Sequence, residues 1–292
     1  RAVIWLSEKL NKAILRLDAA DFYNNQLHNL VHAYESVDEI CRTVFEDIRK
    51  RIAYRSELIQ DSRVIVFSPH PDDDVISMGG ILNKLHQNGN DIVVAYQTSG
   101  NFAVFDHEVR RYLDFLRRFE RDFELSATPI RGLIDEVEHS MATKQPGEID
   151  SEAVQKIKKS IREAEAVSGI ETFGMTREQA RFLNLPFYQT GKVKKDPIGS
   201  EDVRITLELL EEHRPTYVFV AGDLSDPHGT HRMCLQAVHQ ALEQYSGSAP
   251  EVWYYRGAWQ EWEPEQIEMA VPLSPVELMR KRTAIFKHES QK

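Results

Sequence analysis

Short apolar runs alternate with helix-like segments from residue 63 onward, and this alternation constrains the fold more than any other feature of the sequence. Three of the runs are continuous, which is typical of strands buried on both faces: residues 64–67, 92–96 and 217–221. Weaker strands are expected at 182–187, 252–255 and 267–271. Strands that alternate with helices form a parallel sheet between two helical layers. The sequence therefore predicts a Rossmann-like α/β fold with a doubly wound, mainly parallel sheet.

Helical periodicity without strands sets the beginning of the chain apart from the rest. Residues 1–61 carry apolar side chains at helical spacing, and we expect them to form a helical connector or extension. Residues 62–292 then form one α/β domain, in which a charged stretch at about 105–150 is a helical insert. The 292 residues, 41% of them hydrophobic, suffice for such a domain and exclude a disordered or fibrous chain.

Charge and cysteine content limit the partners and the compartment. A net charge of −10 repels phosphate backbones, so we expect no nucleic-acid partner. No apolar run approaches the ~20 residues of a membrane span. Cys41 and Cys234 lie far apart, and no signal-peptide pattern precedes them, so we expect a cytoplasmic protein without disulfides. A chain that starts at Arg1 is expected to be part of a longer one.

Polar loops follow three of the predicted strands. Residues 68–74 follow the first strand, 98–101 the second, and 222–231 the strand at 217–221. Parallel sheets bind ligands beyond the carboxyl ends of their strands, so neighbouring strands would bring these loops to one rim.

The first loop combines His70 with three consecutive aspartates at 72–74, whose carboxylates repel one another unless a cation neutralises them. His70 and Asp73 are three residues apart, so a tight turn can direct both to one point while Asp72 stays free for proton transfer. His231, expected to open the next helix, adds a second imidazole. Two imidazoles and a carboxylate predict a Zn²⁺ site with an open position, and Fe²⁺ or Mn²⁺ fits the same ligand types. The alternative is that these residues only cap a helix and form turns.

Two motifs together resemble those of the PIG-L/LmbE family of zinc-dependent de-N-acetylases: Pro69-His70-Pro71-Asp72-Asp73 and His228-Gly229-Thr230-His231. The Thr98-Ser99-Gly100 turn and the helical segment 162–166 fit the same pattern, and the resemblance covers roughly residues 62–291. It implies a hydrolase that uses activated water to remove an N-acetyl group from an amino sugar or its conjugate.

The resemblance also implies a role for individual residues. It makes His70, Asp73 and His231 the ligands of one zinc ion and Asp72 the general base. It makes His228 the group that stabilises the oxyanion and acts as the acid.

Three further residues are candidates for supporting the site or the substrate. Asp74 stands where the family usually has Glu, and its side chain is one methylene shorter. Asp226 is expected to orient a histidine, the alternative being a turn-forming Asp-Pro pair. Asn101 completes this group.

A more particular resemblance concerns residues 66–101 and 221–231. They look like the deacetylase-like domain that is fused behind a glucosamine-6-phosphate deaminase-like domain in some bacterial proteins. The deaminase half is not recognisable in this chain. The expected partners are therefore an N-acetylated amino sugar or conjugate, a covalently fused deaminase-like domain and further copies of the chain.

Indications of the substrate are sparse. The basic run of Lys192, Lys194 and Lys195 predicts contact with a phosphorylated sugar or, alternatively, is a solvated loop. Trp253, Trp259 and Trp262 either stack on a sugar or pack in the core.

Two other functions are weighed against deacetylation. One is a catalytically idle or regulatory sugar-binding domain. The other is a non-haem Fe²⁺ oxygenase with two histidines and one carboxylate, which the parallel α/β pattern disfavours.

Overall fold

The computed structural model describes residues 1–124, 128–145, 147–189, 195–222 and 224–292. The chain divides into two compact units. The first comprises Arg1–Leu58 and Glu261–Leu273, and the second comprises Ile59–Gln260 and Ser274–Lys292. Among the described residues, no helix is long and apolar enough to cross a membrane.

The second unit is built on five parallel strands in the order β3-β2-β1-β4-β5. Their bounds are β1 Arg63–Ser68, β2 Asp91–Tyr96, β3 Ala180–Phe182, β4 Tyr217–Ala221 and β5 Glu251–Tyr255. The most apolar run, β1, lies in the middle, where the neighbouring strands β2 and β4 keep it from water. The predicted parallel α/β fold is thereby confirmed.

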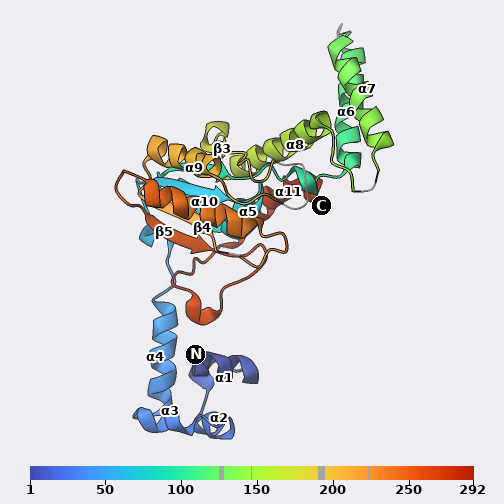
Figure 1. Ribbon diagram of the computed structural model, residues 1–292. Helices are drawn as coiled ribbons and strands as arrows, with labels where there is room; N and C mark the ends of the chain where they lie inside the picture. The colour runs from blue at the N-terminus through green and yellow to red at the C-terminus, as the bar shows by residue number, and fades with distance from the viewer. Residues whose placement is uncertain (125–127, 146, 190–194, 223) are drawn as a thin grey trace. The chain divides into compact units, whose positions relative to one another are not determined.

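Helices cover both faces of this sheet (Figure 1). On one face, Ile65 and Phe67 of β1 share a core with Val203 of α9 (Ser200–His213) and Val238 of α10 (Thr230–Gln244). The alternate residue, Val66, is also fully buried, because strand side chains point to opposite faces in turn. On this second face, α5 (Asp73–Gln87) contacts β1 and β2. Helix α11 (Pro275–Phe286) packs on α5 and also contacts α8 (Glu152–Glu171).

Two helices between β2 and α8 run beside each other as a hairpin (Figure 1): α6, Asp106–Asp122, and α7, Thr128–Thr143. Val109 and Leu113 of α6 pack against Ile134 and Val137 of α7. Phe115 and Phe119 lie on the exposed side of α6.

The first unit is helical and has its own small core. Its helices are α1 Ala2–Leu10, α2 Ala19–Asn24, α3 His28–Ala33 and α4 Val37–Arg49, with 3₁₀ turns η1 Ile14–Arg16, η2 Arg55–Glu57 and η5 Pro264–Gln266. Leu6, Phe22 and Ile40 meet in this core. The Ser36 side chain accepts a hydrogen bond from the Glu39 backbone N–H and so caps α4.

Two of the expected strands are wrong in position or absent. The strand expected at 182–187 ends at Phe182, since Asn184 takes a left-handed conformation with φ 50° and Pro186 has no N–H to donate. The expected strand at 267–271 is reduced to one bridge between Ala270 and Ile52 inside the first unit. The proline at 272 follows directly and cannot extend the pairing.

Candidate metal centre

The carboxyl ends of β1 and β4 bring two distant loops to one edge of the sheet, because these strands are parallel neighbours. His70 lies in the loop after β1, and Asp73 is the first residue of α5. His231 is the second residue of α10, the helix that follows β4. The shared rim expected from the sequence is therefore present.

The three predicted ligand residues converge on one atom. Oδ2 of Asp73 lies 3.1 Å from Nδ1 of His70 and 3.2 Å from Nε2 of His231. One ligand atom from each residue lies within 4.8 Å of the others. Asp73 and His231 are buried, and His70 is partly exposed. In the part of the chain that the structure describes, this is the one such cluster of three.

The protonation state of Asp73 suits a metal ligand. Burial by itself raises its pKa, but hydrogen bonds with His231 and His70 outweigh burial and hold the pKa well below its ordinary value. The Asp73 carboxylate therefore stays ionised. A carboxylate and two imidazoles are a donor set that Zn²⁺ accepts, so the residues fit the metal that the family pattern implies.

Asp74 stabilises the loop after β1 through hydrogen bonds. Its side chain is fully buried, where the Tyr96 hydroxyl donates to Oδ2 at 3.1 Å. Its backbone N–H donates to the Ser68 hydroxyl, which in turn donates to the His70 carbonyl at 2.6 Å. Burial raises the pKa of Asp74 to about 7. The shorter aspartate thus has partners of its own, and its influence on substrate remains a prediction.

Asp72 forms an ion pair with Arg162. Its Oδ2 lies 3.0 Å from Nη2 of Arg162, and the arginine side chain is only 1% exposed. Arg162 belongs to α8, in the segment 162–166 that fitted the family pattern. The pair leaves Asp72 outside the converging ligand set, as the spacing predicts.

The loop before α10 carries the other predicted site residues. Asp226 is buried, and its Oδ2 accepts a hydrogen bond from the Thr230 backbone N–H at 2.7 Å. This contact gives the first backbone N–H of α10 a partner, while orientation of a histidine by Asp226 remains a prediction. His228 is exposed and does not belong to the cluster of three. Asn101, buried at the start of η3 (Asn101–Ala103), accepts a hydrogen bond from the Ser99 hydroxyl at 3.0 Å.

Two aromatic side chains lie beside His70 and each other. The Tyr188 ring meets the His70 ring edge-on, with centroids 6.1 Å apart, and the Phe102 ring lies 5.4 Å from that of Tyr188. Nζ of Lys195 lies 3.3 Å from the Phe102 centroid and 3.9 Å from that of Tyr188. Burial lowers the pKa of Lys195 to about 8. Of the expected basic run, Lys192 and Lys194 lie outside the described residues. The indole of Trp259 is largely exposed, and those of Trp253 and Trp262 are partly buried.

Sequence reasoning missed His288, which follows α11 and is 3% exposed. Burial lowers the pKa of His288 to about 4. The charge of Asp72 raises this pKa and the charge of Arg162 lowers it, but burial has the largest effect. A signal existed in Gly169, a glycine inside a helix: a Cβ there would lie 3.0 Å from Nε2 of His288. Such a glycine indicates a close approach, but it does not say what approaches.

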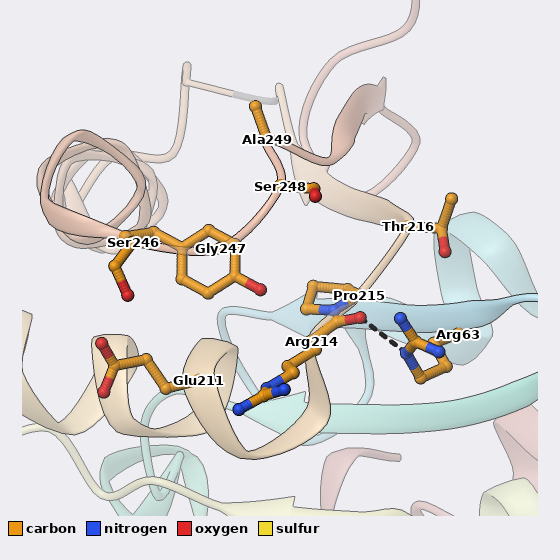
Figure 2. A pocket seen from close by; sticks show the side chains of 10 residues that line it. Arg63, Glu211, Arg214, Pro215, Thr216, Ser246, Gly247, Ser248 and Ala249 are labelled. Carbon is orange, nitrogen blue, oxygen red and sulfur yellow. Dashed lines mark hydrogen bonds between the residues drawn. The ribbon is translucent and has the colours of Figure 1, made fainter.

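A separate cavity of about 930 Å³ lies at the opposite edge of the sheet (Figure 2). It is lined by the first residue of β1, Arg63, by Glu211 and Arg214 of the α9 end, and by residues 245–249. Arg63 Nε donates to the Arg214 carbonyl at 2.7 Å (Figure 2). His70, Asp73 and His231 are not among its walls, so the candidate metal centre lies at the carboxyl edge, apart from this cavity.

Comparison with known proteins agrees with this geometry. Residues 65–242 match a family described as PIG-L, GlcNAc-PI de-N-acetylase. A glucosamine-6-phosphate deaminase-like protein of Bacteroides thetaiotaomicron is 42% identical over 311 residues, which cover 99% of this chain and 47% of the relative. The chain therefore spans about half the length of that relative.

Two deacetylases are also similar. A diacetylchitobiose deacetylase of Thermococcus kodakarensis is 38% identical over 60 residues, which are 20% of this chain and 22% of the relative. The solved structure of N,N'-diacetylchitobiose deacetylase from Pyrococcus horikoshii is 17% identical, with a TM-score of 0.48 and coverage of 80% of this chain and 72% of that one.

Proposed function

The chain belongs to the PIG-L family, and from this premise we propose that it is a metal-dependent hydrolase that removes the N-acetyl group from an amino sugar or its conjugate. The observation that carries the proposal is the convergence of His70 Nδ1 and His231 Nε2 on Oδ2 of Asp73. This cluster lies at the edge where parallel sheets bind their ligands.

We propose that His70, Asp73 and His231 hold one Zn²⁺ ion. When bound, such an ion supplies a Lewis acid that polarises a carbonyl and brings the pKa of water toward ~7. Fe²⁺ and Mn²⁺ fit the same donors, so metal analysis decides among the three.

The proton transfers are assigned to the chain's own residues. Asp72, whose Oδ2 lies 3.0 Å from Nη2 of Arg162, takes the proton from the attacking water. His228, exposed on the loop before α10, donates to the oxyanion that develops on the acetyl carbonyl, and it is the acid that gives a proton to the leaving amine. Asp74, Asp226 and Asn101 hold the loops that carry these groups.

The substrate is proposed to be an amino sugar that carries an anionic substituent such as a phosphate. The rings of Phe102 and Tyr188 offer apolar surface beside His70, and the ammonium of Lys195 lies over both rings. Ring faces suit the apolar side of a pyranose, and a partly desolvated ammonium attracts an anion strongly. Ring-opening deamination is not proposed for these residues. A fused deaminase-like part would carry that activity in a longer protein.

The test combines metal analysis with acetate release by the full chain. The substrates are N-acetylglucosamine, its 6-phosphate, diacetylchitobiose and lipid- or peptide-linked forms. We expect one zinc per chain and acetate release from at least one substrate. Asp72→Asn should keep the metal and lose activity about 100- to 10,000-fold, the range for a general base.

Asp114→Asn is the matched control, since Asp114 is an exposed aspartate on α6. It should behave as the wild type. Unchanged turnover in Asp72→Asn would remove Asp72 from its role. A wild-type chain that binds these sugars and never releases acetate would instead support the idle, regulatory domain.

A further inference from the structure

A chain of buried polar contacts leads from the last turn of the protein to Asp72. In η6 (Glu289–Gln291), Ser290 donates to Glu165 twice: its backbone N–H to Oε1 at 2.7 Å and its hydroxyl to Oε2 at 2.6 Å. Oε2 of Glu165 lies 3.8 Å from Nη1 of Arg162. Nη2 of Arg162 lies 3.0 Å from Oδ2 of Asp72. The contacts therefore run in series through Ser290, Glu165 and Arg162.

Burial makes each of these contacts difficult to replace. Ser290, Glu165 and Arg162 are 2%, 6% and 1% exposed, so water cannot replace a lost partner. A guanidinium is planar and rigid, and its two Nη groups therefore move together. Oε2 of Glu165 attracts one Nη group of Arg162 across 3.8 Å, and because the guanidinium is rigid, this attraction also influences the side that faces Asp72. Breaking one contact in a buried network leaves its neighbour without compensation.

The backbone on the other side of Arg162 leaves little freedom. Gly100 has a left-handed φ of 60°, and a Cβ on it would lie 3.0 Å from Nε of Arg162 and 2.9 Å from Cδ of Pro71. Arg162 and Glu165 are three residues apart on α8, so both side chains leave the same face of the helix. The guanidinium is thus confined between α8 and the loop that follows β2.

We propose that Ser290 and Glu165 are positioning residues that hold Arg162, and through it the Asp72 carboxylate, in the orientation required for proton transfer. The C-terminal turn is then a working part of the active site, although it is remote from Asp72 in the sequence. The inference rests on the proposed function, because Asp72 is its proposed base.

A purely structural role makes a different prediction. If Ser290 only anchored the C-terminus, its loss would lower stability and leave the turnover of folded enzyme unchanged. If it positions Asp72, kcat falls while KM and zinc content stay the same, because neither sugar binding nor the three metal ligands is touched. Misplacement of a reacting group by ~1 Å costs about 100-fold in rate, which sets the upper range of the effect.

The experiment compares Ser290→Ala and Glu165→Gln in the full chain. We expect kcat to fall about 5-fold in the first and about 30-fold in the second, within the range that misplacement allows, with KM and zinc content unchanged. The Glu165→Gln change should have no further effect in an Asp72→Asn background, because the group that it positions is then gone.

Glu277→Gln is the matched control. Glu277 also ties the C-terminal part to the unit, through an ion pair of α11 with Lys84 of α5, but it has no part in the contacts to Asp72. Its loss should lower stability and leave kcat within about 2-fold.

A crystal structure of Glu165→Gln gives a readout that does not depend on activity. We expect the 3.0 Å contact between Arg162 and Asp72 to be lost or lengthened. An intact contact, a wild-type kcat in both variants, or an equal loss in the Asp72→Asn background would each overturn the positioning role. If the wild type releases acetate from none of the substrates, the proposed function fails, and the crystal structure alone then decides on the positioning role.

Discussion

His288 predicts an unusual response of stability to acid. Its ring is buried, and burial lowers its pKa to about 4 from the ordinary 6.5. Between pH 6.5 and pH 4, His288 binds a proton in the unfolded chain but not in the folded chain. The folded state therefore loses stability as pH falls from 6.5 towards 4, and this term amounts to about 2 kcal/mol between pH 7 and pH 5.

Asp74 acts in the opposite direction over the same range. Burial raises its pKa to about 7, above the ordinary 3.8. The folded carboxyl takes up its proton before the unfolded one, so folding gains stability as pH falls from 7 towards 4. The gain is again about 2 kcal/mol between pH 7 and pH 5. In the wild type the two terms nearly cancel.

His288→Gln removes one of these terms and leaves the other. Relative to wild type, the variant should gain about 2 kcal/mol in unfolding free energy on going from pH 7 to pH 5, whatever its stability at pH 7. For a unit of this size that equals a relative rise in Tm of about 4–8 °C. Asp74→Asn should show the reverse and lose about 2 kcal/mol over the same interval.

The assay is urea or thermal unfolding of the full chain at both pH values, followed by circular dichroism. Excess chelator is present throughout, so that release of a metal ion does not add its own pH dependence. Equal pH dependence in wild type and His288→Gln would refute the reasoning, because it would mean that the folded chain protonates His288 as readily as the unfolded one.

Three further predictions concern the substrate, the loop after β2 and the first unit. Lys195→Met should lower kcat/KM for a phosphorylated amino sugar about 10-fold or more and change the neutral sugar much less, because only the former offers an anion to the ammonium; equal losses on both would contradict this. Gly100→Ala should destabilise the chain by about 1–3 kcal/mol and lower acetate release, since its φ is 60° and the new Cβ would press on Pro71 and Arg162; unfolding curves and steady-state kinetics check both effects. Phe22→Ala, which leaves a cavity in the core of the first unit, should lower the unfolding free energy of that unit by about 3–5 kcal/mol and leave acetate release unchanged. A parallel loss of activity would show that the second unit needs the first.

Much of the candidate site is local in the sequence and could be predicted. His70 and Asp73 share one turn, and turn geometry alone directs two side chains three residues apart towards one point. His231 could be added because it follows another buried strand, and the carboxyl ends of parallel strands meet at one edge. The strand predicted at 267–271 was wrong because its apolar pattern is short. Whether so short a segment pairs with a sheet depends on the neighbouring chain segments, which the local pattern does not specify.

The sequence by itself determined the parallel sheet, the loops at its rim and the donor types of the candidate metal site, because these features depend on hydrophobic periodicity and on residues close together in the sequence. The tertiary structure decided which remote groups reach that rim. Arg162, Glu165, Ser290 and His288 come from α8 and from the last turns of the chain. The contacts of Ser290, Glu165 and Arg162 in series towards Asp72 depend on how helices pack. The family pattern at 162–166 and the helical Gly169 were visible in the sequence, but neither says which remote side chain it meets.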